Sequence, residues 1–269
     1  MPEPETTPAA DTAPRPGDSY VQSFARGLAV IRSFDARAPQ QTLTEVAQRT
    51  GLTRAGARRI LLTLEGLGYV RSQGRQFCLT PRILDLGFAY LSSLPLWNLA
   101  EPVMQALVEE LKESCSAAVL DGADIVYVLR VPTHKIMSIN LGIGSRLPAA
   151  CTSMGRTLLA EFETSAVDAL LRQHPLVAHT ARTITDAAAL HAELARVRAQ
   201  GWCLVDQELE EGLISVAAPL KNRAGQVVAA LNISGQANRT STEMLREQLL
   251  PELLATAQAI SRTVGLRRA

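Results

Sequence analysis

The fold of this chain is decided by residues 43–66, which read LTEVAQRTGLTRAGARRILLTLEG. Thr44 is predicted to be the N-cap of a short helix that ends at Gly51, and Thr53 the N-cap of a second helix. Two short helices joined by a tight turn are typical of a helix-turn-helix. This stretch therefore predicts a helix-turn-helix.

The second of these helices has one apolar face and one basic face. Its apolar stripe consists of Ala57, Ile60, Leu61 and Leu64. At about 100° per residue, Ala55 and Arg59 point away from this stripe, and Arg58 lies at its shoulder. A DNA-reading helix packs one face on its own domain and presents the other to the major groove. We therefore predict that this is a recognition helix.

The flanking residues complete a winged form of the motif. Apolar side chains at helical spacing predict a first helix that begins at Ser23. Downstream, residues 69–72 and 75–79 are predicted to be two strands around the turn Gln73-Gly74. This hairpin would be the wing, with Arg71 and Arg75 near the DNA backbone.

The distribution of charge favours a nucleic-acid partner. The chain carries +1 overall, but residues 51–82 hold six arginines and a single acid, Glu65, which gives that segment +5. A local basic patch is the electrostatic footprint of phosphate binding, and a solvated arginine-rich helix face is the alternative explanation. Thr53 fits both a phosphate contact and a plain N-cap. The candidate DNA-binding residues are Thr53, Arg54, Ala55, Arg58, Arg59, Arg71 and Arg75.

Length and composition favour a two-domain cytoplasmic protein. The chain has 269 residues, of which 47% are hydrophobic, and its four cysteines are scattered, as in a reducing compartment. No apolar run approaches the roughly 18 residues of a membrane span, and the start does not resemble an export signal. We expect a disordered tail at 1–19, a winged helix-turn-helix domain at 20–80, a linker helix at 81–96 and a second domain at 97–266.

The second domain alternates strands and helices. Turns such as Asp121-Gly122 favour antiparallel hairpins. The expected strands cover 117–120, 125–131, 135–141, 202–206, 214–220 and 227–234. The expected helices cover 99–114, 152–162, 186–200 and 241–264. This pattern predicts an α+β domain in which helices flank an antiparallel sheet. The linker helix carries an apolar stripe that a second copy of the chain could cover.

Motifs for catalysis and for metal binding are missing from the sequence. The four histidines, His134, His174, His179 and His191, do not have the spacing of zinc ligands. The run Gly142-Ile143-Gly144 lacks the third glycine of a dinucleotide loop, and no nucleophile elbow occurs outside the tail. We therefore expect a protein that is not an enzyme, with no cofactor and no metal.

Several segments resemble the IclR family of bacterial regulators. Residues 23–31, SFARGLAVI, and the run 43–62 are similar to the DNA-binding part of that family. The segments RLP at 146–148, CTSMGR at 151–156, GLISVAAP at 212–219 and AALNISG at 229–235 are similar to the core of its sensor domain. The resemblance covers about residues 20–265 and is greatest to the subgroup that governs protocatechuate, 4-hydroxybenzoate and β-ketoadipate catabolism.

This resemblance implies a GAF-like effector-binding domain, a homodimer or homotetramer, and three other partners: operator DNA, a small organic acid and RNA polymerase. In relatives of known structure, the ligand lies over the sheet beside the loop that matches Ser153 and Met154. Residues matching Ile139, Ser215, Asn232 and Ser234 line that site, and an acid matching Asp206 lies near it. The family often has serine where this chain has Asn232, so the ligand contacts there stay open.

The residues themselves fit an acidic ligand. Ser153 begins a predicted helix whose N-terminus favours an anion. The side chains of Ser215, Asn232 and Ser234 can donate hydrogen bonds to a carboxylate, although serines satisfied within the sheet are the alternative. Arg130 and Arg146 are candidate counter-charges for a dicarboxylate, with surface or structural roles favoured for both.

Three other interpretations stay open. A regulator of the same architecture would respond to a glyoxylate-like acid or another aromatic, and the volume of the pocket separates these ligands. An enzyme with a fused winged helix would need a clustered nucleophile and base. A winged helix that contacts protein instead of DNA would make Arg59→Ala silent in promoter binding.

Overall fold

The computed structural model describes residues 20–92, 96–133 and 141–266, and the chain divides between Tyr90 and Leu91 into two compact units. The predicted tail, most of the predicted strand at 135–141 and the candidate residue Ile139 lie outside the described residues. No helix of the described part is long and apolar enough to cross a membrane. All four cysteines are buried free thiols.

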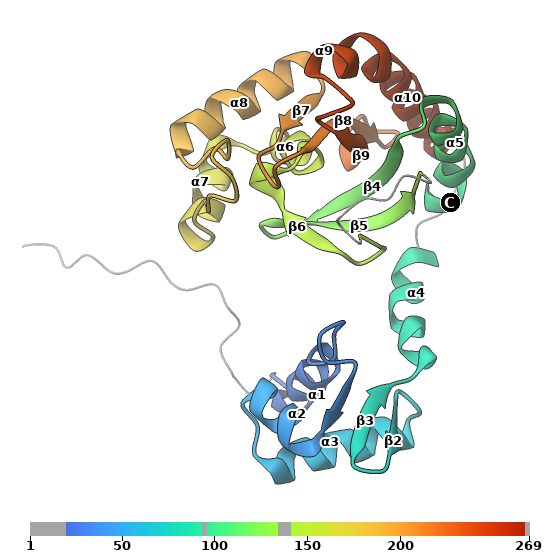
Figure 1. Ribbon diagram of the computed structural model, residues 1–269, viewed down its shortest axis with the longest axis vertical. Coiled ribbons are helices and arrows are strands. Elements are labelled where there is room, and N and C mark those ends of the chain that lie inside the picture. The colour runs from blue at the N-terminus through green and yellow to red at the C-terminus, as the bar shows by residue number, and fades with distance from the viewer. Residues whose placement is uncertain (1–19, 93–95, 134–140, 267–269) are drawn as a thin grey trace, which may run out of the picture. The chain divides into compact units, whose positions relative to one another are not determined.

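The first unit is the predicted winged helix-turn-helix (Figure 1). Its helices are α1 (Gln22–Arg32), α2 (Leu43–Thr50) and α3 (Arg54–Gly66). Its strands are β1 (Gln40–Thr42), β2 (Val70–Gln73) and β3 (Gln76–Leu79), in the order β1-β3-β2. The three helices and the sheet enclose one core, to which α3 contributes Ala57, Leu61 and Leu64. Strand β1, which the sequence pattern did not predict, pairs with β3.

The helix caps of this unit explain where α2 and α3 begin. The predicted cap at Thr44 is wrong, because the N-cap of α2 is Thr42. The Thr42 side chain accepts from the Glu45 N–H, and the Glu45 carboxylate accepts from the Thr42 N–H at 2.6 Å. This reciprocal capping box satisfies two free N–H groups of the first turn. The prediction for Thr53 is confirmed, because its Oγ1 accepts from the Gly56 N–H at 3.1 Å.

A short 3₁₀ turn, η1 (Pro81–Ile83), leads into α4 (Leu84–Ser92). These elements fall within the predicted linker helix at 81–96. No side chain of α4 is buried among the described residues, and Leu84 and Phe88 are 70% and 68% exposed. The predicted apolar stripe is therefore present, with Leu84 and Phe88 exposed and Leu91 packed against the core of the second unit.

The second unit is built on one six-stranded antiparallel sheet; its antiparallel character was predicted, but strand β6 (Arg146–Pro148) was not. Its strands are β4 (Ser114–Asp121), β5 (Asp124–Val131), β6 (Arg146–Pro148), β7 (Cys203–Asp206), β8 (Leu213–Lys221) and β9 (Val227–Gln236). Their order is β6-β5-β4-β9-β8-β7. Because successive side chains of a strand point to opposite faces, each strand supplies two separate cores.

Helices cover both faces of this sheet (Figure 1). One core lies under α5 (Leu96–Leu111) and the C-terminal helix, which runs through α9 (Thr242–Met244), a π turn (Leu245–Leu249) and α10 (Leu250–Leu266). The other lies under α6 (Ser153–Leu159), α7 (Thr164–Gln173) and α8 (Ala187–Gln200), joined by the short turn η2 (Ala149–Cys151). Helix α7 is absent from the expectations, and α8 has the predicted caps, Asp186 and Gly201.

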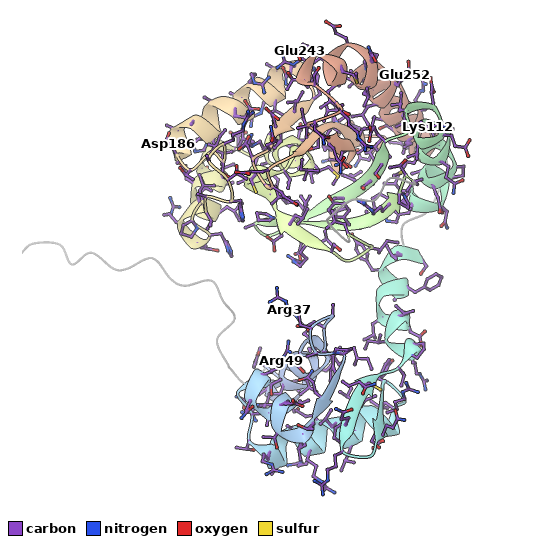
Figure 2. The ribbon with its side chains drawn as sticks, in the orientation of Figure 1. Arg37, Arg49, Lys112, Asp186, Glu243 and Glu252 are labelled. Carbon is purple, nitrogen blue, oxygen red and sulfur yellow. The ribbon has the colours of Figure 1, made fainter. Side chains whose placement is uncertain are left out.

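Two helices of this unit are displaced from their predicted ranges. Helix α5 ends at Leu111 instead of 114, because Lys112 adopts a positive φ of 56° and Ser114 already belongs to β4 (Figure 2). Helix α6 ends at Leu159 instead of 162, so it has only two turns and its dipole is small. The role expected for its N-terminus is correspondingly weakened.

Candidate functional site

The outer face of α3 is basic and free of ion pairs. Arg54, Arg58 and Arg59 are exposed, together with Thr53 and Ala55, while the stripe opposite them is buried. Among the described residues, none of these arginines approaches a carboxylate closely enough to form an ion pair. The predicted recognition face is therefore available to an anionic partner.

The one acid of this segment holds the wing against α3. The Glu65 carboxylate accepts from the backbone N–H of Ser72 at 3.0 Å and from its hydroxyl at 2.5 Å. Arg71 is exposed but donates through Nε to the Cys78 Sγ at 3.1 Å, which directs its side chain along the hairpin. Arg75 is exposed beside Gly74, whose φ of 64° forms the tip of the turn. The hairpin is thus positioned relative to α3 with its basic residues outward.

A hollow lies in the second unit between the sheet and the start of α6. Its cavity volume is about 30 Å³, room for one or two water molecules, and it is partly open to solvent. The described residues that line it are Tyr127, Leu141, Leu147, Cys151, Thr152, Ser153, Met154, Val205, Leu209, Leu213, Ser215, Asn232 and Ser234. Five of the seven candidate effector-binding residues are therefore brought together: Ser153, Met154, Ser215, Asn232 and Ser234.

Hydroxyl and amide groups form the floor of this pocket. Ser215 and Ser234 are register partners on neighbouring strands, and the Ser215 hydroxyl donates to the Ser153 Oγ at 2.9 Å. The Asn232 Oδ1 accepts from the backbone N–H of Ser116 at 3.1 Å. This bond occupies the acceptor side of the amide, so Asn232 offers the pocket its NH₂ group as a donor.

Tyr127 is the most informative lining residue that the sequence reasoning missed. Burial raises the pKa of its phenol to about 12, an effect that the positive charge of Arg130 partly offsets. The phenol therefore stays protonated at neutral pH and is a hydrogen-bond donor. Alternate side chains of a strand share a face, so the burial expected of the apolar Ile125 could have indicated Tyr127, and both pack in the same core.

Asp206 is not among the described residues that line the hollow, and its expected place near the ligand stays a prediction. Val205 faces the hollow, and the next residue of β7 points to the other side. The Asp206 carboxylate instead forms an ion pair with Arg182 and accepts from the Gln207 side chain at 3.1 Å. Ile139 lies outside the described residues.

A buried ion pair supports the two walls of the pocket. Arg156 in α6 donates to both carboxylate oxygens of Glu208, at 2.6 and 2.5 Å, and to the Ala150 carbonyl at 2.7 Å. Glu208 also accepts from the Ile184 N–H at 3.0 Å. The pair joins α6, which carries Ser153, to the segment after β7, which supplies Leu209 and Leu213. Sequence reasoning missed this pair, whose members are 52 positions apart.

The chemistry of this pocket suits binding of a small molecule. Its described lining contains apolar walls and neutral hydrogen-bonding groups but no acid, histidine, lysine or arginine. Within the described residues, no group of three or more His, Cys, Asp or Glu side chains is placed to hold a metal ion. Such pockets fix the orientation of a mostly apolar ligand through a few polar groups.

A winged helix-turn-helix joined to a ligand-pocket domain defines the class of one-component transcription regulators that respond to a small molecule. Two family models match the chain: "IclR helix-turn-helix domain" over residues 23–74 and "Bacterial transcriptional regulator IclR C-terminal" over residues 88–262. The chain belongs to the IclR family of bacterial transcriptional regulators.

Relatives and solved structures agree with this membership. The chain is 45% identical over 240 residues to the Pca regulon regulatory protein of Pseudomonas putida, covering 89% of this chain and 82% of that protein. A crystal structure from Rhodococcus sp. RHA1, described as a transcriptional regulator, is 52% identical with a TM-score of 0.83, covering 91% of this chain and 98% of that one. The PobR inducer-binding domain from Acinetobacter, a double mutant in complex with 3-hydroxybenzoic acid, is 31% identical with a TM-score of 0.59, covering 61% and 97%.

Proposed function

We propose that this regulator binds operator DNA through α3 and the wing, and that a hydroxybenzoate-type acid in the pocket controls this binding. The observation that carries the proposal is a serine and amide floor beneath apolar walls, which matches a ring with polar substituents. The similarity to a Pca regulon regulator and to an inducer domain that holds 3-hydroxybenzoic acid supports the same ligand class. The protein acts in the cytoplasm, where operator DNA and RNA polymerase are available to it.

Operator recognition rests on the exposed arginines of α3. Arg59 lies on the helix face opposite the core and Arg58 at the edge of that face, and both are exposed, so their side chains can reach base edges or phosphates in a major groove. Arg71 and Arg75 on the wing are placed for contacts to the sugar-phosphate backbone. Thr53 and Arg54 begin α3, whose free N–H groups suit a phosphate.

Arg59→Ala should lower the affinity for operator DNA roughly 10-fold, because one lost guanidinium contact costs about 1–3 kcal/mol. Fluorescence anisotropy on the upstream region of the gene, at several salt concentrations, measures this loss. The logarithmic salt slope should also fall by about 1. Arg37→Ala is the matched control, because Arg37 is an exposed arginine that projects from the loop before β1 (Figure 2). Equal losses in both variants, or binding indifferent to salt, would contradict the DNA-binding role.

Control by the acid follows from linkage between the two sites. An acid that binds one arrangement of the regulator better than another shifts operator affinity, and couplings of this kind are typically about 5- to 150-fold. Adding 4-hydroxybenzoate or protocatechuate to the same anisotropy titration tests for this shift. Unchanged operator affinity at saturating acid would refute control by that acid.

A second copy of the chain is the partner that we propose for the exposed apolar surfaces of the first unit. Exposed apolar side chains lie at and just before α1 (Val21, Phe24 and Leu28) and on α4, where Leu84 and Phe88 share one side and Leu86 and Tyr90 the other. Large exposed apolar surfaces often mark protein–protein contacts, and an isologous dimer would present two recognition helices to an inverted repeat. Sedimentation velocity of the full chain should give a dimer or tetramer, and a monomer would refute the proposal.

A further inference from the structure

We infer that Arg130 supplies the positive charge that binds the effector's carboxylate, in a subsite that it forms with Ser116 and Tyr127 beside Asn232. This inference rests on the proposed function, because it assigns a group of the ligand to a place that adjoins the same pocket: Tyr127 and Asn232 line the hollow, and Arg130 and Ser116 lie beside them outside its described lining. The ligand class that it specifies is a planar carboxylic acid bound as its anion.

A β-bulge places Arg130 on the pocket face of the sheet. Strand β5 pairs with β4 so that Tyr127 opposes Ala118 and Leu129 opposes Ala117, which leaves one extra residue in β5. A bulge reverses the alternation of the side chains that follow it. Leu129 accordingly packs in the core on the far face, whereas Tyr127 packs in the core on the pocket face. Arg130, three residues after Tyr127, therefore shares the face of Tyr127.

The strand register aligns Arg130 with the polar residues at the floor of the pocket. Ser116 is the register partner of Arg130 on one side and of Asn232 on the other. The Arg130 Nη1 lies 3.4 Å from the Ser116 Oγ, and the backbone N–H of Ser116 donates to the Asn232 Oδ1 at 3.1 Å. Arg130, Ser116 and Asn232 thus form one polar row across three strands, of which Asn232 lines the hollow.

Arg130 has no carboxylate partner among the described residues. Its side chain is partly buried, and its hydrogen bond within the described chain is the one to Ser116. A partly buried cation without a counter-ion has an electrostatic free-energy cost, and an anion that binds beside it reduces that cost. Its charge also acts on the Tyr127 phenol, whose pKa it lowers against the larger effect of burial.

The other arginines near the pocket are already neutralised. Arg146, the second counter-charge considered from the sequence, bonds to Asp121 at 2.6 Å and to Asp124 at 3.1 Å, and these carboxylates raise its pKa. Arg156 is paired with Glu208. Of these three arginines, only Arg130 retains an unpaired charge for a ligand.

The strand spacing matches the length of a benzoate-sized anion, which the hollow would have to widen to hold. Arg130 lies on β5 and Ser215 on β8, three strands apart in the order β5-β4-β9-β8. At about 4.8 Å between neighbouring strands, their backbones lie about 14 Å apart. An extended arginine side chain and one substituted aromatic ring together fill this span. A carboxylate at Arg130 would leave a ring hydroxyl for Ser215 and Ser153.

Isothermal titration calorimetry of the full chain tests the assignment. The ligands are 4-hydroxybenzoate, 3-hydroxybenzoate and protocatechuate, and the tightest of them is compared with its uncharged carboxamide. Arg130→Gln should weaken binding of the acid at least 10-fold and change binding of the amide less than about 3-fold, because only the acid carries the charge. Arg130→Lys should recover part of the loss. Arg146→Gln, which removes the same charge from the same sheet, should bind the acid like the wild type.

The outcomes separate this inference from the function that underlies it. If the wild type binds none of the acids, the proposed effector class and the carboxylate subsite both fail. If the wild type binds an acid and Arg130→Gln binds it equally well, the subsite fails and the effector class stands. Equal losses for acid and amide, or an equal loss in Arg146→Gln, would also overturn the role of Arg130. If Arg130→Gln does not fold by circular dichroism, Arg130→Lys decides the question. Reduced selectivity for the acid over the amide, relative to the wild type, supports a contact between position 130 and the carboxylate, and undiminished selectivity overturns it.

Discussion

Gly155→Ala should lower the melting temperature of the effector-binding unit by about 6–12 °C or prevent the unit from folding. A Cβ at position 155 would lie 2.1 Å from the carbonyl oxygen of Ala149 and 2.3 Å from its Cα. Both are backbone atoms of the turn η2, so no side-chain rotation relieves the overlap, and α6 would have to move. Overpacking of this kind costs about 3 kcal/mol or more, which corresponds to the stated shift for a unit of this size.

Differential scanning calorimetry of the full chain measures this effect, with Gly66→Ala as the matched control. Gly66 is also a helical glycine, but a Cβ there would meet no atom within 4 Å. The control should change stability by no more than about 1 kcal/mol, in the stabilising direction. If the melting temperature of Gly155→Ala lies within 2 °C of the wild type, the loss of stability is under about 1 kcal/mol. That result would show that the fold does not require the close approach of α6 and η2.

Arg156→Met should destabilise the same unit by about 3–5 kcal/mol, because it leaves the carboxylate of Glu208 buried without its cation. Arg156 is 1% exposed and Glu208 8% exposed, so water cannot replace the lost bonds to the guanidinium. Unfolding by urea, followed by circular dichroism, gives the free energy of unfolding. We also expect weaker effector binding, because the pair joins α6 to the segment that carries Leu209 and Leu213.

The double variant Arg156→Met, Glu208→Gln separates loss of the pair from loss of packing. Removing both charges relieves the unpaired carboxylate, so the double variant should be more stable than Arg156→Met alone. Arg196→Met is the control for an exposed bidentate pair, because Arg196 bonds to both oxygens of Glu193 but is 44% exposed. Exposed pairs contribute at most about 1 kcal/mol. A double variant no more stable than Arg156→Met would contradict this account.

The DNA-binding unit could be predicted from the sequence because its signals are local. The apolar stripe of α3, the cap at Thr53 and the turn at Gly74 each depend on residues within a few positions of one another. The cap of α2 was assigned to Thr44 instead of Thr42 because both threonines precede the same helix, and only the backbone conformation distinguishes them. Strand β1 was missed because three residues, paired with β3 some 35 positions later, carry no periodicity of their own.

The effector site was predictable only in part. Ser215 and Ser234 were recognised because a polar side chain in an apolar strand needs a partner. Whether Asp206 or Val205 faces the hollow could not be decided from the sequence, because the side of β7 that faces it depends on the pairing of β7 with β8. Arg130 and Arg146 could not be told apart from the sequence. The bulge in β5 and the acids around Arg146 decide which of them keeps a free charge.

By itself, the sequence determined the two-part organisation, the recognition helix with its arginines, and the antiparallel sheet. These features depend on periodicity, helix caps and tight turns, which involve residues close together in the chain. Only the tertiary structure decided which side chains share the pocket, that Arg156 meets Glu208, and that Arg130 turns to the pocket face. The reason is that strand register, bulges and long-range ion pairs join residues tens of positions apart. Their geometry arises when the sheet and its covering helices pack together.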